Sequence, residues 1–569
     1  MRYYIVALVL FGLKVKAQEN YSISTRQALE TMWKSKDETG YKRALDMYEN
    51  AFEIYPDSID AGGLYKAAVL AGQLKELDKA FQFLTNLVEI DTDLNTGLSG
   101  WSSITGKYAE SEYKNLINDP RWKLIKEKAV FKRNLFFKEL KASENEFFNV
   151  QKNNFGNTKN PKHLYSEIKN HQPYLPKQQQ NYSIAFKIND STQTALLVHL
   201  PKNYHPEKKY PLLFFLHGAV RHNGLSDFQP IELNLGGWNR YYTKYAEQNE
   251  VILVFPKGSS QYNWMTPDDG FFMIPEMLKL IKKGINVDDN KVFISGHSNG
   301  ATGSFSYWMK QPTQFAGFYG FNTYPMIFTG GTFVENSKNR SFINFSTDED
   351  YYYPPNANDD FTKLMNGNNA DYKEYRYNGF PHWFPEFDES EPAFKILFED
   401  LIQRERNPFP KEISWEFDNE NYGNIDWISD IKLDTLNSKT TWHKELNFKI
   451  DKWLEFEDQE DEDEDNDNLI VKEVDVNAFK FPRKSGKIKA EYGNNVFRIE
   501  TSNIASFSIL ISPEMVHLKK KVKIYINGKL HFNEKIKYNQ EFMLQNFEDK
   551  KDREQIWINY IKLKLKNNF

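Results

Sequence analysis

The sequence predicts an α/β domain with a mostly parallel sheet, preceded by an all-α region and followed by an all-β domain. Apolar positions recur at three- and four-residue spacings over residues 22–150, which indicates helices. From about residue 180 short apolar runs alternate with helical stretches, and this alternation ends near Pro408. The predicted domains are a signal peptide at 1–17, a helical region at 18–150, a linker at 151–180, an α/β domain at 181–408 and a β-rich domain at 409–569.

Length and composition narrow the range of functions. A chain of 569 residues exceeds what one hydrophobic core supports, so several domains are expected. The net charge of −5 provides no basic field for a phosphate backbone, and we expect no nucleic-acid partner. The absence of cysteine excludes disulfides, thiolate metal sites and a cysteine nucleophile.

The first residues have the pattern of a secretory signal. Arg2 precedes an apolar run over 3–13, and Ala17 follows as the small residue of a cleavage site. The run has about eleven residues, against roughly 20 in a membrane-spanning helix, so no transmembrane segment is expected. Because the chain lacks cysteine, we expect export to a bacterial periplasm or exterior. A frayed N-terminal helix is the alternative.

Small residues in the helical region have the spacing of a repeat. Ala44, Ala51 and Pro56 allow two helices to pack closely and end the second one, and a weaker copy covers 67–90. This pattern resembles a tetratricopeptide repeat, and two copies fall short of a free-standing solenoid. A protein partner on these repeats and a plain helical bundle are the two interpretations.

The α/β domain is predicted from apolar runs that suit strands buried on both faces. The predicted strands are 194–200, 211–216, 251–255, 292–295, 315–321, 342–346 and 372–377, and the predicted helices include 237–247, 271–283 and 300–310. In the β-rich domain, Asn527-Gly528 predicts a type I′ hairpin turn. The acidic run 455–467 is expected to be a solvated loop, because its closely spaced charges repel one another. A calcium site is the alternative, although the run lacks the glycine turn of an EF-hand loop.

A G-x-S-x-G motif at residues 296–300 joins the predicted strand 292–295 to the following helix. In so tight a turn the serine adopts a strained conformation and its hydroxyl projects above the sheet, which predicts Ser298 as a nucleophile. The backbone N–H of Asn299, at the helix N-terminus, is predicted to face a developing oxyanion. A second oxyanion donor is expected after His217-Gly218, from the N–H of Ala219 or Val220.

A serine nucleophile needs a base, and four of the eleven histidines follow Ser298. Three of them lie in the predicted β-rich domain, which leaves His382. The orienting acid is expected between the two along the chain, at the end of a strand. Both Asp348 and Asp350 follow the predicted strand 342–346, and chain order alone does not separate them.

The motifs L-H-G, G-H-S-N-G-A, D-x-x-Y-P and G-F-P-H-W occur in this order, and over these residues the chain resembles the α/β-hydrolase superfamily. The likeness is to its secreted esterase, polyhydroxybutyrate-depolymerase-like and peptidase groups. The resemblance implies Asp350, four residues before Pro354, as the acid and Asp348 as the alternative. It also implies the nucleophile Ser298, the base His382 and the oxyanion donors Asn299 and Ala219. Ala219 and Ala301 replace glycines found in many relatives.

We therefore expect an exported serine hydrolase that cleaves a small-molecule or polymer ester through an acyl-enzyme intermediate, without a cofactor or metal. A serine peptidase shares this chemistry, and a non-catalytic binding scaffold is the alternative from another class. Trp264, Tyr351 and Trp383 flank the predicted site and are expected to contact substrate, although aromatic side chains in such loops also serve as packing.

Overall fold

The computed structural model describes residues 20–93, 99–152, 155, 158, 160–229, 239–265, 271–434, 436, 438–456 and 469–565. The predicted signal peptide and acidic residues 457–467 lie outside this part. The chain forms two compact units, one of Met1–Ser143 with Pro230–Asn234, the other of Glu144–Gln229 with Leu235–Phe569. Within the described residues, no helix combines the length and apolar character needed to cross a membrane.

The first unit is helical, as predicted. After a helix at 20–34, its helices are α2 (Glu38–Ile54), α3 (Ala61–Gln73), α4 (Leu77–Glu89), α5 (Trp101–Thr105), α6 (Ala109–Glu112) and the start of α7 (Pro120–Phe147). Helices α2, α3 and α4 pack in sequence, and the small residues Ala44, Ala51 and Ala80 are buried there. Asp37 and Asp60 cap α2 and α3 by accepting backbone N–H groups.

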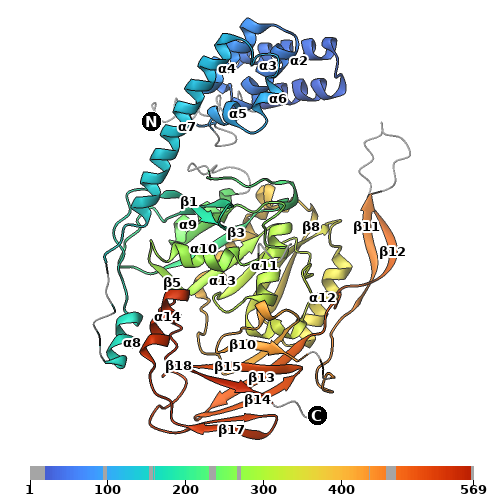
Figure 1. Ribbon diagram of the computed structural model, residues 1–569. Helices are drawn as coiled ribbons and strands as arrows, with labels where there is room; N and C mark the ends of the chain where they lie inside the picture. Colours follow the sequence, from blue (N-terminus) through green and yellow to red (C-terminus); the bar gives the residue numbers. More distant parts are fainter. Residues whose placement is uncertain are drawn as a thin grey trace, which may run out of the picture. The chain divides into compact units, whose positions relative to one another are not determined.

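The second unit is built on an eight-stranded sheet with the order β1-β2-β4-β3-β5-β6-β7-β8. The strands are β1 (Asn181–Lys187), β2 (Gln193–His199), β3 (Tyr210–Leu216), β4 (Ile252–Pro256), β5 (Val287–Gly296), β6 (Gly317–Phe321), β7 (Ser341–Glu349) and β8 (Tyr372–Pro381). Strand β2 runs antiparallel to both neighbours, and all pairs from β4 to β8 are parallel. The predicted mostly parallel sheet is therefore confirmed (Figure 1).

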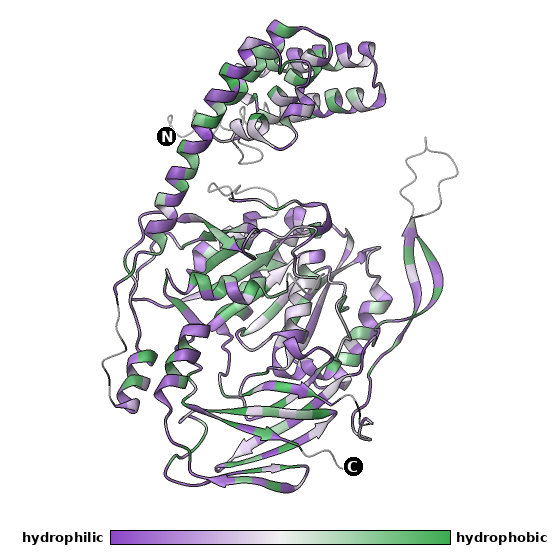
Figure 2. Cartoon of the chain, viewed as in Figure 1, coloured by the Kyte–Doolittle hydropathy of each residue, from purple (hydrophilic) through white to green (hydrophobic). Residues whose placement is uncertain are grey.

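Helices pack against this sheet, whose central strands contain many hydrophobic residues (green in Figure 2) that belong to the buried core. They are α9 (Arg240–Asn249), α10 (Met273–Ile281), α11 (Asn299–Lys310), α12 (Pro355–Gly367) and α13 (Glu391–Gln403). Helix α11 follows β5 directly and is buried along nearly its whole length. The end of β5 and the start of α11 therefore form a fixed turn at the carboxyl edge of the sheet.

The stretch predicted as a linker, 151–180, contains helix α8 (Pro161–Lys169). Asn160 caps this helix, and the side chains of Leu164 and Ile168 are buried in the core of the second unit. The polar composition of the stretch concealed this short amphipathic helix.

The C-terminal region contains three sheets, with the orders β10-β15-β18, β11-β12 and β17-β16-β14-β13-β9. The strands are β9 (Glu412–Phe417), β10 (Ile428–Leu433), β11 (Lys449–Phe456), β12 (Leu469–Asn477), β13 (Gly486–Gly493), β14 (Val496–Ser502), β15 (Ile504–Ile511), β16 (Val522–Ile526), β17 (Lys529–Glu534) and β18 (Asn559–Lys564). The prediction of an all-β region is wrong in one respect, because α14 (Gln540–Lys550) lies between β17 and β18. Asn527 and Gly528 both have positive φ between β16 and β17, which confirms the predicted turn.

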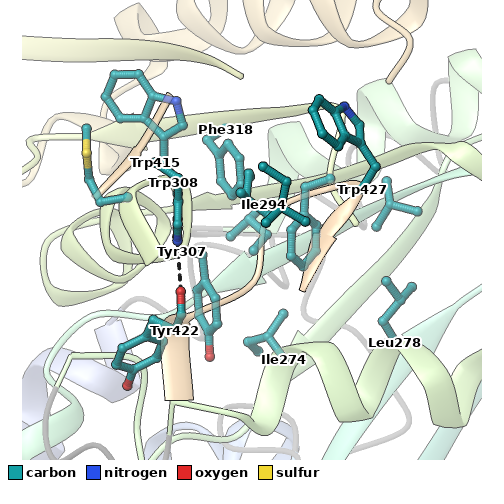
Figure 3. Close-up of a cluster of buried hydrophobic side chains, with 14 of the residues drawn as sticks. Ile274, Leu278, Ile294, Tyr307, Trp308, Phe318, Trp415, Tyr422 and Trp427 are labelled. Atoms are coloured by element: carbon teal, nitrogen blue, oxygen red, sulfur yellow. Dashed lines mark hydrogen bonds between the residues drawn. The ribbon is translucent and has the colours of Figure 1, made fainter. Parts of the chain in front are cut away.

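The α/β sheet and the C-terminal region share one core. Trp415 and Trp427 of the C-terminal region belong to the same buried cluster as Ile294 and Trp308 (Figure 3). Buried ion pairs join the two parts as well: the Arg553 guanidinium lies 2.9 Å from Asp289, and that of Arg406 lies 2.8 Å from Asp552. The two predicted domains on either side of residue 408 therefore form one packed body.

Candidate active site

Ser298 occupies the turn between β5 and α11 in a conformation that glycines on both sides make accessible. Its φ of 56° and ψ of −123° are strained for a side chain with a Cβ. A Cβ at Gly296 would lie 2.3 Å from the carbonyl carbon of Gly300, and one at Gly300 would lie 1.8 Å from the carbonyl oxygen of Leu216. Positions 296 and 300 therefore have no room for any residue larger than glycine. The half-buried Ser298 lies at the N-terminus of a helix.

His382 follows β8 and is paired with Asp350, which follows β7. The Nδ1 of His382 donates to the Oδ1 of Asp350 over 2.9 Å, and the two residues are 1% and 2% exposed. The backbone N–H of Tyr352 donates to the same carboxylate oxygen at 2.9 Å. The Nε2 of His382 is buried and has no hydrogen-bond partner among the described residues. The imidazole is therefore oriented on one side and available on the other.

Asp348, the alternative acid, has a different partner. It is half-buried, and its Oδ1 accepts the backbone N–H of Gly379 in β8 at 2.7 Å. This contact lies at the register irregularity between β7 and β8, which falls between Thr347 and Glu349. Chain order left both aspartates open and the resemblance implied Asp350; the structure brings Asp350 to His382.

Two side chains that the sequence analysis did not single out hold the backbone of His382. The Nε2 of His297 and the Nδ2 of Asn322 each donate to the carbonyl oxygen of His382 at 2.8 Å. Burial, with the nearby His382, lowers the pKa of His297 to about 3, so this imidazole is neutral. His297 adjoins Ser298 in the chain, and these hydrogen bonds therefore tie the histidine loop to the nucleophile turn.

The loop predicted to provide an oxyanion donor lies beside Ser298. A Cβ at Gly218 would lie 3.2 Å from the Cβ of Ser298, and Ala219 follows with φ of 51°, in the left-handed region that favours glycine. His217 fixes the loop, since its Nδ1 donates to the Gly218 carbonyl at 2.7 Å and its Nε2 accepts the N–H of Gly258 at 3.1 Å. Burial lowers the pKa of His217 to about 4, consistent with a neutral ring.

Of the three aromatic residues predicted to contact substrate, two lie at the site. Trp383 is 44% exposed with its ring centroid 5.2 Å from that of His382, and Tyr351 is half-buried with its ring 6.4 Å from His382. Tyr352, 48% exposed, is nearer at 4.4 Å. The expectation for Trp264 is wrong, because its fully buried indole packs edge-on against His217 and cannot line an open cleft.

The described residues contain no group of three or more histidine, aspartate or glutamate side chains arranged to hold a metal ion. The calcium alternative falls on the acidic run, of which residues 457–467 lie outside the described part.

Part of the chain that contains this site is similar to a known protein family. Residues 191–324 match the model of a family described as "Putative esterase", and this segment includes both Ser298 and the loop at Gly218. No curated protein sequence matches the chain. The matched segment is similar to this family and makes up less than a quarter of the chain.

Solved structures with a similar fold include a thermostable esterase at 20% identity and a TM-score of 0.33, covering 40% of this chain. The chain spans 64% of that esterase's length. Others are esterase 2 of Thermogutta terrifontis, at 14% identity and TM-score 0.32, and a fluorophosphonate-binding serine hydrolase of Staphylococcus aureus, at 15% and 0.30. These two likenesses cover 40% and 39% of this chain, and 96% and 98% of the respective structures.

Proposed function

We propose that this chain is a carboxylic ester hydrolase that uses Ser298, His382 and Asp350 as a catalytic triad. One observation carries the proposal. A buried imidazole donates Nδ1–H to a buried carboxylate, its Nε2 has no hydrogen-bond partner among the described residues, and its loop is tied to the turn at Ser298. In this tautomer Nε2 is the basic nitrogen, ready to accept a hydroxyl proton.

The first half of the reaction acylates the serine. The Oγ of Ser298 attacks the ester carbonyl carbon while its proton passes to Nε2 of His382, and the imidazolium formed is stabilised by Asp350. The carbonyl oxygen becomes an oxyanion that accepts hydrogen bonds from the backbone N–H groups of Asn299 and Ala219. When the C–O bond breaks, His382 returns the proton to the leaving alcohol.

The second half frees the enzyme. Water donates a proton to His382 and attacks the acyl carbon, and collapse of the second tetrahedral intermediate releases the carboxylic acid and restores the serine hydroxyl. Exposed Tyr352 and Trp383 beside His382 provide an apolar wall for a substrate group, which suits a small-molecule or polymer ester.

The test combines a fluorophosphonate probe with a substrate panel. We expect the probe to label the purified protein but not Ser298→Ala, and a soluble ester to be cleaved at least roughly tenfold faster than any peptide anilide. Labelling with a preference for anilides would replace the esterase by a serine peptidase. No labelling of folded protein would favour a binding scaffold without activity.

Two further proposals concern the N-terminal part. Residues 1–17 are proposed to direct export to the periplasm or the exterior, which predicts a mature chain that begins at Gln18 by intact-mass measurement. Helices α2, α3 and α4, which pack in sequence, are proposed to be tetratricopeptide-like and to bind a protein partner. Cross-linking in cells, with and without residues 18–143, would test that partner, and an unchanged pattern would contradict it.

A further inference from the structure

The β11–β12 hairpin of the C-terminal region lies against α12. It forms a sheet of its own, and β12 is exposed over most of its length. An isolated two-stranded hairpin is at best marginally stable in water, so its position depends on contacts with other elements. In Figure 1 the hairpin stands beside α12, and α12 and β11 are in contact.

Side chains at the start of α12 and on β11 make this contact specific. The Nδ2 of Asn356, in the first turn of α12, donates to the Oδ1 of Asp451 at 3.3 Å and to the carbonyl oxygen of Lys452 at 3.1 Å. The next residue of β11, Trp453, donates its Nε1–H to the carbonyl oxygen of Tyr351 at 3.1 Å. Trp453, 102 positions further along the chain than Tyr351, thus donates a hydrogen bond to the backbone of the loop that contains Asp350.

The indole also packs against this loop. Its ring is edge-on to Tyr353 at 6.1 Å and tilted against Tyr324 at 6.2 Å. Tyr353 is 3% exposed, so it is a fixed point of the loop. Trp453 therefore contacts the loop through Tyr351 on one side and Tyr353 on the other, and between them lies Tyr352, whose N–H donates to Asp350.

From these contacts we propose that Trp453 is a positioning residue, which holds the 350–354 loop so that Asp350 meets His382. The inference rests on the proposed function, and it makes the C-terminal region part of the active site. Trp453 does not touch the reacting atoms; it acts through the Tyr351 carbonyl and the Tyr353 ring. The hydrogen bond and the ring contact are separable, since phenylalanine keeps a ring and loses the N–H.

Steady-state kinetics on a soluble ester provide the first test. We expect Trp453→Phe to lower kcat roughly three- to tenfold, the effect of one hydrogen bond, with KM changed less than about twofold. Trp453→Ala, which also loses the ring, is expected to lower kcat roughly 30- to 100-fold through misplacement of the acid. Trp442→Phe, the same substitution at a half-buried site of the C-terminal region, is the control and keeps kcat.

A double-mutant cycle separates positioning from a merely structural role. If Trp453 acts through Asp350, Trp453→Phe adds little to the loss in an Asp350→Asn background. Equal losses in both backgrounds, or an unchanged kcat with only a lower melting temperature, would overturn the proposal. Should Trp453→Ala fail to fold, Trp453→Phe still decides.

A substrate-independent measurement distinguishes failure of this inference from failure of the proposed function. In proton NMR, the Nδ1 proton of His382 in its hydrogen bond to Asp350 is expected to give a resolved downfield signal in the wild type. We expect Trp453→Phe to shift or broaden this signal and Trp442→Phe to leave it in place. A wild type without esterase activity would refute the function, and an unchanged signal in Trp453→Phe would refute the positioning.

Discussion

Replacing Asp350 by asparagine removes one charge from the site and reverses one hydrogen bond. In the wild type, the carboxylate accepts Nδ1–H of His382 and the N–H of Tyr352 on the same oxygen. An amide oxygen in that place lacks the negative charge that stabilises the imidazolium, and an amide NH₂ turned to Nδ1 forces the hydrogen onto Nε2. The imidazole then presents a donor to Ser298, where an acceptor is required.

The magnitude follows from this reversal. We expect Asp350→Asn to lower kcat roughly 10³- to 10⁴-fold, or about 4 to 5.5 kcal/mol in activation free energy, because the wrong tautomer and the lost charge both act on the transition state. Asp348→Asn is the matched control on the same strand end. Its carboxylate is half-buried and accepts one backbone N–H, so the change should cost less than tenfold.

The assay is kcat on a soluble ester for both variants, with circular dichroism and the thermal midpoint as checks on folding. Fluorophosphonate labelling rates give an independent measure of how reactive the serine is. If Asp348→Asn is the crippled variant and Asp350→Asn stays near wild type, with both folded, the assignment of the acid is refuted although a triad remains. If neither loses activity, the triad itself is refuted.

Other predictions test the remaining parts of the site. Ser298→Ala and His382→Ala should each lower kcat by roughly three to six orders of magnitude in single-turnover assays, and the double variant should lose little more, because the pair acts as a unit. Gly300→Ala should abolish folding or activity because its Cβ would overlap the Leu216 carbonyl, whereas Gly367→Ala, with open space around it, should leave the thermal midpoint within a few degrees; a tolerated Gly300→Ala would contradict the steric argument. Stability should fall as pH is lowered from about 6.5 toward 3, because unfolded His297 binds a proton that the folded chain excludes, an effect of up to about 5 kcal/mol; calorimetry showing a flat profile over this window would contradict it.

Local patterns were sufficient to predict the sheet and the nucleophile turn. Parallel strands buried on both faces appear as apolar runs, and the pair Gly296 and Gly300 is needed wherever a strand turns directly into a helix over a serine. The acid required more than local patterns. Asp348 and Asp350 both follow the apolar run, and only the spacing to Pro354, through the family resemblance, favoured Asp350. In the structure β7 extends to Glu349, and Asp350 directly after it meets His382.

Contacts between distant segments lay beyond sequence analysis. Asn322 follows β6 and has no motif of its own, yet it holds the carbonyl of His382 sixty residues away. Trp264 had the residue type and the location expected of a binding-site aromatic, but Gly258 and Gly303 leave room for the indole beneath His217, and it is buried. Burial of a single aromatic side chain depends on such gaps in the packing, which composition and periodicity do not reveal.

The boundary at residue 408 shows why a change of secondary-structure pattern does not imply separate domains. The sequence changes there from alternating strands and helices to short strands, but Trp415 continues the core of the sheet, with its Nε1–H donated to the carbonyl of Tyr422 (Figure 3). Arg553 pairs with Asp289 of β5, and without it that buried carboxylate would lose one of its two cations. The sheet therefore depends on the C-terminal region for its packing. The β11–β12 hairpin belongs to that region and contacts the loop of Asp350, the proposed acid, through Trp453.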